Sequence, residues 1–415
     1  MAATHGPRDG HWWLPWTLLG DGDRRLRRDL ARYAQPTCRT NSTAIAVGKR
    51  VVFHTASLRG GGSERVFTLM ANALAGRGHE VTLFTWNADG PNATLLSPAV
   101  SLVSLDLPIH GEGYGKIGAI RGIFQSALFF RRHRPDAVFS APEFANLAIS
   151  MALRLSASRA RFFPSFHAAA GLPSTTFGAN LAVTLSDLVR SRASKAIAVS
   201  QGIGQDLEAR GFDRQRVAII NNPLPPKQTK QSVDDRWQTD LAAMGKATVI
   251  ATAGRLVPVK DHKTLIAAFA RLRQTHEARL VIFGEGPLAA DLRNQADALG
   301  IGQSVLLPGY VNDLTDCYKA ADMFVLSSTS EGFGNVLIEA MAEGVPVIST
   351  DAPYGPREIL GDGLYGALVP VGDTQALAKA MASMMDRPTD RQALRQRAKD
   401  FDIDLIADRY EALLS

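Results

Sequence analysis

Short runs of β-branched and aromatic residues alternate with longer amphipathic segments from Arg50 to the end of the chain. A continuous apolar run of this length is typical of a strand buried on both faces, and apolar residues spaced three or four apart are typical of a helix. The alternation predicts repeated strand and helix units that form parallel sheets. The expected strands are Val51–His54, Val81–Trp86, Ser101–Leu105, Ala137–Ser140, Arg161–Phe166, Ala196–Ser200, Val217–Ile220, Thr248–Ala253, Arg279–Phe283, Ser304–Leu307, Met323–Leu326, Val347–Ser349 and, more weakly, Gly366–Val369.

The expected strands form two sets, separated by a polar, proline-rich stretch that starts at Asn221 and reads NNPLPPKQTKQSVDD. Such a composition is typical of a linker. The sequence therefore predicts an α/β protein with two doubly wound, Rossmann-like parallel-sheet domains that face a central cleft. The domains are expected at residues 49–222 and 246–400, with the linker at 223–245. Ligands of such folds bind beyond the carboxyl ends of the strands, so chemistry is expected in the loops that follow them.

Length and composition exclude several classes of protein. A chain of 415 residues with 46% apolar and 21% charged residues is long enough for more than one core and is neither disordered nor fibrous. Two cysteines cannot form a disulfide framework or a four-cysteine zinc site. No stretch approaches the roughly 18 apolar residues of a membrane-spanning helix. Residues 1–48 lack the pattern of a signal peptide and are expected to be a poorly ordered tail, with contact of its tryptophans to a partner or lipid left open.

Charge is unevenly distributed between the two halves. Residues 1–225 carry 26 Lys and Arg against 15 Asp and Glu, a net of +11, whereas the remainder carries 20 against 25, a net of −5. This asymmetry predicts that the first half meets an anionic partner, which the charge alone leaves open among a membrane surface, a phosphorylated acceptor and a nucleic acid.

Glycines follow the first expected strand. Gly60, Gly61 and Gly62 lead directly into an amphipathic segment, so backbone N–H groups and a helix N-terminus are available there to a phosphate or a sugar oxygen. A flexible turn in which Ser63 caps the helix is an equally good interpretation of these residues taken alone.

Two cations follow the strand Thr248–Ala253. Arg255 and Lys260 lie between this strand and the next helix, in the sequence GRLVPVKDHKTL. A guanidinium and a mobile ammonium at the mouth of a cleft can bind a diphosphate. They can also neutralise its negative charge when it departs as a leaving group. The alternative is a solvated basic loop.

Two carboxylates follow the strand Met323–Leu326. Glu331 and Glu339 are separated by seven residues in EGFGNVLIEAMAEGVPVIST, and a helix is expected to start near Phe333, Gly334 or Asn335. The N–H groups at its N-terminus can bind a phosphate, and the two carboxylates can accept hydrogen bonds from the hydroxyls of a sugar and of a ribose. A hydrolytic carboxylate pair is the less favoured alternative, because one residue lies in a loop and the other within a helix.

Together these segments resemble the family 4 glycosyltransferases of the GT-B fold. The resemblance covers about residues 50–415 and rests on GGGSER, on GRL with Lys260, on FGEGP and on the pair of glutamates. It implies an enzyme, a hexosyltransferase that moves a sugar from a nucleotide donor with retention of anomeric configuration. No metal ion and no cofactor is expected.

The resemblance also implies roles for individual residues. Arg255 and Lys260 would hold the donor diphosphate, Glu339 the ribose, and Glu331 with the backbone of Phe333, Gly334 and Asn335 the sugar and phosphates. Gly61 and Gly62 would close over the donor from the first domain, and Tyr310 and Val311 would contact the base. Residues 49–222 would be the acceptor domain and 246–400 the donor domain, with a terminal helix at 401–415 that crosses back onto the first domain.

His167 ends a strand-like run, FFPSFH, which resembles the segment that places a histidine beside the transferred sugar in this family. Its imidazole would hydrogen-bond a sugar hydroxyl or assist the acceptor. A purely structural histidine is the alternative.

The sequence identifies the donor and acceptor substrates less directly. STDAPYGPREIL resembles the segment found in bacterial members that build lipid-linked or surface oligosaccharides from UDP-sugars, which favours UDP, a hexose or N-acetylhexosamine, and a glycan or polyprenyl-diphosphate-linked saccharide acceptor. Other GT-B enzymes, such as an epimerase, and a basic binding protein without catalysis are the competing interpretations. No recognition motif for nucleic acid is present.

Residues 116–134 combine apolar bulk with a basic end. They are equally compatible with a helix lying on an anionic membrane and with a buried helix that carries cations at its C-terminus. The two cysteines are expected to be reduced thiols of a cytoplasmic protein, and peripheral contact of this helix with the inner face of the cytoplasmic membrane is an open alternative.

Overall fold

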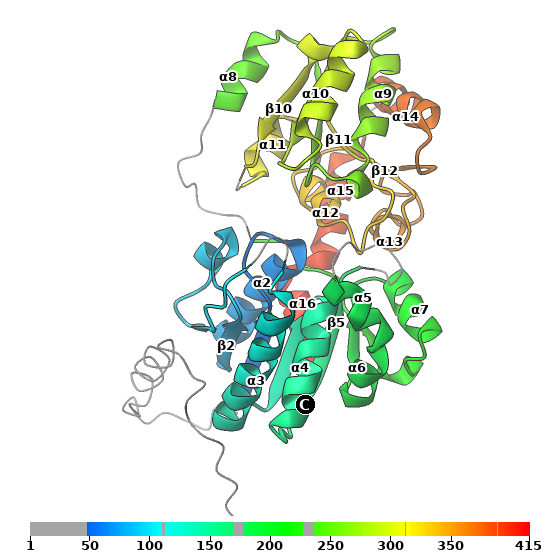
Figure 1. Cartoon of the computed structure of the whole chain (residues 1–415). Coiled ribbons are helices and arrows are strands. Elements are labelled where there is room, and N and C mark those ends of the chain that lie inside the picture. Colours follow the sequence, from blue (N-terminus) through cyan, green and yellow to red (C-terminus); the bar gives the residue numbers. More distant parts are fainter. Residues whose placement is uncertain (1–47, 110–112, 169–176, 227–235, 312, 388) are drawn as a thin grey trace, which may run out of the picture. The chain divides into compact units, whose positions relative to one another are not determined.

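The computed structural model describes residues 48–415 except 110–112, 169–176, 227–235, 312 and 388 (Figure 1). It contains two Rossmann-like α/β domains, each built on one parallel sheet. The expected tail, up to residue 47, and the centre of the expected linker lie outside the described residues.

The first sheet has seven strands in the order β3-β2-β1-β4-β5-β6-β7. Its ladders are parallel, with Val51 opposite Val81 on one side and Ala137 on the other. The strands are β1 (Arg50–Thr55), β2 (Glu80–Thr85), β3 (Ser101–Ser104), β4 (Ala137–Ala141), β5 (Arg161–Phe166), β6 (Ala196–Ala198) and β7 (Val217–Ile219).

The second sheet has six strands in the order β10-β9-β8-β11-β12-β13, again parallel, with Ile250 opposite Leu280 and Met323. The strands are β8 (Thr248–Ala253), β9 (Ala278–Phe283), β10 (Val305–Gly309), β11 (Met323–Leu326), β12 (Val347–Thr350) and β13 (Ala367–Val369). Every strand that the hydrophobic pattern predicts is therefore confirmed to within a few residues. The order of strands reverses between β1 and β4 and between β8 and β11, which are the switch points where doubly wound folds bind ligands.

Helices connect the strands of both sheets. In the first domain they are α2 (Gly62–Gly76), α3 (Gly115–His133), α4 (Glu143–Leu155), α5 (Phe177–Thr184), α6 (Ser186–Arg192) and α7 (Gln201–Ala209). Further along the chain they are α8 (Arg236–Ala243), α9 (His262–Leu272), α10 (Ala289–Ala298), α11 (Thr315–Ala320), α12 (Asn335–Ala342), α13 (Gly355–Ile359), α14 (Thr374–Asp386), α15 (Arg391–Ala398) and α16 (Ile403–Ala412). Short 3₁₀ turns are η2 (Pro91–Leu95), η3 (Arg214–Arg216), η4 (Pro258–Lys260), η5 (Gly302–Ser304) and η6 (Lys399–Phe401).

The two faces of the first sheet belong to different clusters of buried side chains, because successive strand residues point to opposite faces. Val51 and Phe53 pack with residues of α2 and α16, whereas Val52 packs with residues of α3 and α4. Both faces are thus covered, which explains why the strands read as continuous apolar runs.

The C-terminal helix α16 packs on the first domain. The ring of Tyr410 lies 6.2 Å from that of Phe53 and 5.2 Å from that of Phe139. At the surface, the guanidinium of Arg77, which follows α2 directly, pairs with Asp408 and with Glu411, at 2.8 Å from the latter. The last helix of the chain is therefore part of the core of the first domain.

Helix α8 lies within residues 223–245, where the sequence predicts a linker. Its Trp237 is buried and meets the Phe283 ring of β9 edge to face at 5.2 Å. Packing of the second domain thus begins before the first strand of its sheet.

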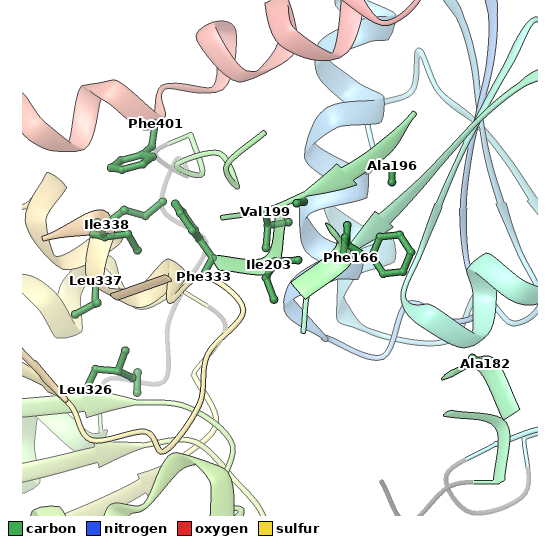
Figure 2. Packing of buried hydrophobic residues seen from close by; sticks show 14 of the residues in the cluster. Phe166, Ala182, Ala196, Val199, Ile203, Leu326, Phe333, Leu337, Ile338 and Phe401 are labelled. Atoms are coloured by element: carbon green, nitrogen blue, oxygen red, sulfur yellow. The ribbon is translucent and has the colours of Figure 1, made fainter. Parts of the chain in front are cut away.

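One cluster of buried side chains includes residues of both domains. In Figure 2, Phe333 lies among Ile338, Phe401 and Ile203, which come from α12, from η6 and from α7 of the first domain. The rings of Phe333 and Phe401 are 5.5 Å apart, at 70°. The loop that precedes α12 is therefore anchored by an aromatic side chain.

Helix α3 buries small residues in its middle and two phenylalanines near its end, and it exposes four other large apolar side chains. A Cβ added to Gly122 would meet the Trp86 ring at 2.7 Å, so the helix approaches the sheet closely at this point. Gly122, Ser126 and Ala127 face inward together with Phe129 and Phe130. The outward face carries four large apolar side chains, Ile117, Ile120, Phe124 and Leu128.

Candidate functional site

The loop after β8 carries the two predicted cations. Arg255 follows the strand by two residues and its side chain is exposed. Lys260 ends the turn η4, and its side chain packs over Gly254, whose added Cβ would lie 3.6 Å from Lys260 Cδ. Asp261 then caps α9 by accepting a hydrogen bond from the Thr264 N–H at 3.3 Å. Both cations therefore lie beyond the carboxyl end of β8, at the switch point of the second sheet.

The FGEGP loop after β9 supports this cation loop. Gly284 has a φ of +132°, and a Cβ there would lie 2.0 Å from the Gly254 carbonyl oxygen. The Leu256 N–H donates to the Glu285 carbonyl oxygen at 2.8 Å. Only glycine permits this approach of two backbones, so the motif serves to place Arg255 and Lys260.

Lys260 and Glu331 form an ion pair between loops of neighbouring strands. The distance from Lys260 Nζ to Glu331 Oε1 is 2.6 Å, and the two side chains are 21% and 10% exposed. The Ser328 hydroxyl donates to the same carboxylate oxygen at 2.6 Å. A mobile ammonium is thereby held next to a carboxylate that follows β11.

Helix α12 begins close to this pair. Gly334, with a φ of +107°, precedes its first residue, Asn335, and the sequence-based start of the helix is confirmed. Asn335 Oδ1 accepts a hydrogen bond from Asn222 Nδ2 of the first domain at 2.9 Å. The Leu337 N–H donates to the Gly334 carbonyl oxygen at 2.9 Å, and the N–H groups of Asn335 and Val336 are the candidates for an anion at this end of the helix.

Glu339, one turn further along α12, is bound on both carboxylate oxygens. Its Oε1 is 3.3 Å from Arg65 Nη1 of α2, and its Oε2 accepts a hydrogen bond from the Tyr318 hydroxyl at 3.0 Å. Burial raises the pKa of the Glu339 carboxyl above its ordinary value, while Arg65 and Tyr318 act in the opposite direction. The residue therefore joins the two domains in this structure.

Gly61 and Gly62 lie at the N-terminus of α2. The Gly61 N–H donates to Glu64 Oε2 at 2.8 Å, and the Ser57 hydroxyl donates to Glu64 Oε1 at 2.8 Å. A Cβ on Gly62 would lie 3.9 Å from Asn335 Nδ2, so this turn meets the start of α12. The predicted cap, Ser63, is instead the second residue of the helix, after Gly62.

His167 follows β5 directly. Its Nε2 is 2.9 Å from Ser165 Oγ, and its ring meets the Phe67 ring of α2 edge to face at 6.1 Å. Burial lowers the pKa of His167 to about 3, so the imidazole is neutral at physiological pH. Its carbonyl oxygen lies against Gly332, where an added Cβ would be 1.8 Å away. The backbone of His167 thus borders the loop that carries Glu331.

The predicted base contacts follow β10. Tyr310 is 53% exposed and Val311 is partly buried, and both come directly after the strand, which ends at Gly309. The strand end that carries them borders the FGEGP loop, since the Gly284 N–H donates to the Gly309 carbonyl oxygen at 2.7 Å.

Glu358 of the GPREIL segment binds the first domain. Its Oε2 accepts from the Gln201 N–H at the start of α7, and its Oε1 accepts from Asn221 Nδ2, both at 2.7 Å. Ser200, which caps α7, donates to the Gly332 carbonyl oxygen at 3.0 Å. These contacts tie α7 to the loops around Glu331.

The structure thus brings together Lys260 with Glu331, and Gly62 with Asn335. Sequence reasoning missed Arg65, Tyr318 and Ser328, which bind the two glutamates. The sequence could have indicated Arg65, as the cation of GGGSER, and Ser328, as a hydroxyl three residues before Glu331. Tyr318 carries no signal in the sequence.

Within the described part of the chain, no group of three or more His, Cys, Asp or Glu side chains is placed to hold a metal ion, and no helix is long and apolar enough to cross a membrane.

Two protein families match successive parts of the chain. Residues 61–223 match the family described as glycosyl transferase 4-like domain, and residues 233–401 match the family described as glycosyl transferases group 1. The first match starts at the glycine turn, and the second contains the cation loop and both glutamates.

Curated relatives agree with these matches. The lipopolysaccharide core biosynthesis glycosyltransferase LpsE of Rhizobium meliloti is 28% identical over 374 residues, which are 86% of this chain and 96% of LpsE. A diphospho-undecaprenol 4-alpha-N-acetylgalactosaminyltransferase of Campylobacter jejuni is 34% identical over 169 residues, 41% of this chain and 45% of that protein.

Solved structures share the fold. Anabaena HepE, determined in complex with UDP and glucose, superposes with a TM-score of 0.73 at 22% identity, covering 88% of this chain and 99% of its own. WaaG, a glycosyltransferase involved in lipopolysaccharide biosynthesis, superposes with a TM-score of 0.66 at 18% identity, covering 88% of this chain and 99% of its own. The expected GT-B architecture of two Rossmann-like domains is confirmed, and the chain belongs to the glycosyltransferases that join a glycosyl transferase 4-like domain to a glycosyl transferases group 1 domain.

Proposed function

We propose that this glycosyltransferase moves a hexose or N-acetylhexosamine from a UDP-sugar to a glycan or lipid-linked saccharide, with retention of anomeric configuration and without a metal ion. The observation that carries the proposal is the ion pair of Lys260 and Glu331 at the carboxyl ends of β8 and β11, beside the N-terminus of α12. An ammonium, a carboxylate and a helix N-terminus at a switch point suit a sugar attached to a diphosphate.

Lys260 and Arg255 would bind the diphosphate of the donor. The Lys260 ammonium is already held at this position by Glu331 and moves toward the phosphates on a flexible stem when the donor binds. Glu331 then accepts hydrogen bonds from hydroxyls of the transferred sugar, while the backbone N–H groups of Gly334 and Asn335 contact the phosphates. Gly61 and Gly62 would cover the donor from the first domain, since Gly62 lies next to Asn335.

Glu339 would bind the ribose of the donor, and Tyr310 and Val311 would contact the base. The two contacts that Glu339 makes with Arg65 and Tyr318 leave lone pairs on both carboxylate oxygens for ribose hydroxyls. The loop that starts at Tyr310 follows the edge strand β10, one strand beyond the FGEGP loop.

Retention would proceed on one face of the sugar. A bond forms from the acceptor oxygen to the anomeric carbon as the bond from that carbon to the phosphate oxygen breaks, and the proton of the attacking hydroxyl passes to the departing phosphate. Arg255 and Lys260 stabilise the negative charge that develops on the diphosphate. The orientation of the two substrates supplies the remaining rate enhancement, because the site holds the acceptor next to the donor.

A donor screen tests the proposal. Purified protein is heated with UDP-, GDP- and ADP-sugars, with and without a chelator, and hydrolysis of each donor is measured in parallel. We expect stabilisation by UDP-sugars alone, independent of the chelator and lost in Glu339→Ala. No response to any nucleotide sugar, or a response that needs a divalent ion, would contradict the proposal and favour a binding role for the basic first half.

Helix α3 would bind the surface of the membrane in which a lipid-linked acceptor is anchored. The α3 stripe consists of Ile117, Ile120, Phe124 and Leu128, which are 84%, 57%, 58% and 52% exposed. The other exposed side chains of this 19-residue helix are all basic, and the helix contains no acidic residue. They are Lys116, Arg121, Arg131 and Arg132. Large apolar side chains flanked by cations alone match an anionic bilayer in both polarity and charge.

Helix α3 also starts at the carboxyl edge of the first sheet. Tyr114, just before the helix, donates a hydrogen bond to the Ala56 carbonyl oxygen, in the loop that leads to Gly61 and Gly62. A lipid-linked saccharide anchored beside Ile117 would therefore present its sugar near the glycine turn.

Vesicle sedimentation tests the α3 stripe. Binding to phosphatidylglycerol vesicles should fall by roughly tenfold or more in the triple variant Ile120→Ser, Phe124→Ser and Leu128→Ser. The control variant Leu364→Ser removes a side chain that is 77% exposed in the second domain, and binding should not change. Equal loss in both variants, absence of vesicle binding, or a dimer that the triple variant abolishes would contradict the membrane surface.

A further inference from the structure

Arg65 carries a positive charge from the first domain to Glu339 of the second. Its Nη1 is 3.3 Å from Glu339 Oε1, and the two side chains are 28% and 11% exposed. The Tyr318 hydroxyl donates to the other carboxylate oxygen at 3.0 Å. A largely buried carboxylate is thus held by a cation from one domain and by a hydroxyl from the other.

The same two helices also meet one turn earlier. Gly62 and Arg65 are three residues apart on α2, and Asn335 and Glu339 are four residues apart on α12, so each pair lies on one face of its helix. Gly62 lies next to Asn335, as Arg65 lies next to Glu339. The first turn of α2 therefore runs along α12 from its N-terminus to Glu339.

Hydrogen bonds fix the start of α2. The Arg65 N–H donates to the Gly61 carbonyl oxygen at 3.1 Å. The Glu64 carboxylate accepts from the Gly61 N–H and from the Ser57 hydroxyl, both at 2.8 Å. The Arg65 side chain therefore extends toward α12 from a turn whose backbone is held in place.

The charges of the proposed donor site show why a further cation is needed there. In the second domain the proposed function assigns two cations and two carboxylates to the donor, and their formal charges cancel. They are Arg255 and Lys260, and Glu331 and Glu339. The diphosphate of a donor is anionic, so a set of groups without net charge attracts it weakly. Arg65 gives the combined set a net positive charge.

The Arg65 guanidinium can contact a second anion while it holds Glu339. In the hydrogen bonds between described residues it uses Nη1 for the Glu339 carboxylate, and a guanidinium has five N–H groups. These groups form a planar fork that binds carboxylate and phosphate oxygens equally well. Glu339 lies about 6 Å along the helix axis from Asn335, so the phosphate that joins a ribose at Glu339 to a diphosphate at the helix N-terminus would lie beside Arg65.

We infer that Arg65 is a donor-binding residue whose guanidinium holds the Glu339 carboxylate and binds the ribose-linked phosphate of the nucleotide. The inference rests on the proposed function, in which Glu339 binds the ribose. It makes the phosphate site a shared one, since the first domain supplies a cation to a nucleotide that the second domain otherwise holds.

Calorimetric titration of the full chain with UDP and with uridine, which lacks the phosphates, tests this contact. Arg65→Gln should lower the ratio of UDP affinity to uridine affinity by roughly tenfold or more, the effect of one charge-assisted hydrogen bond. Arg65→Lys keeps the charge without the fork and should give an intermediate ratio. Arg190→Gln removes a first-domain arginine that pairs with Asp187 at 2.8 Å, and as the control it should keep the wild-type ratio.

The same titrations in a Glu339→Gln background separate a phosphate contact from an effect through Glu339. There the carboxylate charge is absent, and adding Arg65→Gln should still lower the ratio of UDP affinity to uridine affinity. An unchanged ratio in Arg65→Gln, or a fall that disappears in the Glu339→Gln background, would overturn the inference and reduce Arg65 to an interdomain ion pair. Absence of UDP binding by the wild type would instead be a failure of the proposed function, and the inference would fall with it.

Discussion

The loops of the two sheets are organised in different ways. In the second domain, charged side chains from neighbouring loops bind one another, as Lys260 and Glu331 do at 2.6 Å. In the first domain, Gly61 binds Glu64 and His167 contacts Ser165 within their own segments, and Arg65 is the charged side chain that reaches Glu339 of the second domain. The loops of the second sheet therefore hold a paired ammonium and carboxylate, whereas those of the first present mainly backbone groups and a neutral imidazole beside Arg65. This difference fits one half that holds a charged nucleotide donor and another that orients neutral hydroxyls.

The largest effect is expected where the charge of the second domain is removed. Lys260→Ala deletes the ammonium and leaves the 10% exposed Glu331 carboxylate without its partner. Turnover of a UDP-sugar should fall by roughly 10²- to 10³-fold, because charge on the departing diphosphate is no longer neutralised. Lys263→Ala, at an exposed lysine 3.9 Å from Asp291, is the matched control and should retain the wild-type rate. Comparable rates in the two variants would remove Lys260 from the chemistry.

A smaller effect is expected where the loops of the second domain pack. Gly355→Ala would place a Cβ 1.9 Å from the Phe333 carbonyl oxygen, so the loop before α12 must shift. We expect a loss of about 1–3 kcal/mol in the free energy of unfolding, as for other overpacked sites. Gly76→Ala, where a Cβ would have no heavy atom within 4 Å, should be neutral or slightly stabilising. Urea unfolding of both variants measures the difference, and equal stability would show that the loop yields without cost.

Nucleotide affinity should respond to Glu339. Glu339→Gln keeps the shape of the side chain but removes the charge that faces Arg65. The dissociation constant for UDP should rise roughly tenfold, since hydrogen bonds of ribose hydroxyls to a charged acceptor become bonds to a neutral one. Glu343→Gln, at the C-terminal end of the same helix, is the control. Calorimetric titration compares them, and unchanged affinity in Glu339→Gln would place the ribose elsewhere.

The smallest effect concerns the tie between α16 and the first domain. Hydrogen bonds from Arg77 and His79 lower the pKa of Glu411 below its ordinary value of 4.5. A lowered carboxyl pKa in the folded state contributes stability above the ordinary value, and this contribution is lost as the pH falls through the lowered pKa. Glu411→Gln should therefore cost at most about 1 kcal/mol at neutral pH, because the pair is near the surface, and less with added salt. Denaturation at neutral and acidic pH measures this, and a cost that persists under acid would contradict the assignment.

The fold was legible from the sequence because its strands are buried on both faces. The strand expected at Met323–Leu326 is β11, and that at Arg161–Phe166 is β5, with the same bounds. The orientation of α3 was not legible, because apolar residues occur on both of its sides. Close contact between Gly122 and the Trp86 ring turns the small residues inward and leaves Ile117 and Phe124 outside.

The candidate site was legible where chemistry follows a strand in the sequence. Arg255, Lys260 and Glu331 could be proposed for this reason, and the structure places Lys260 against Glu331. The contact between Arg65 and Glu339 could not be derived, because it joins residues 274 positions apart in different domains.

The most direct test of the account is the anomeric configuration of the sugar released when water replaces the acceptor. A UDP-α-sugar is incubated with the enzyme and a chelator, and ¹H NMR spectra are recorded before the free sugar mutarotates. The account predicts that the α-anomer appears first, that the rate is unaffected by the chelator, and that Lys260→Ala abolishes the signal. Initial release of the β-anomer, or release only after a divalent ion is added, would contradict it.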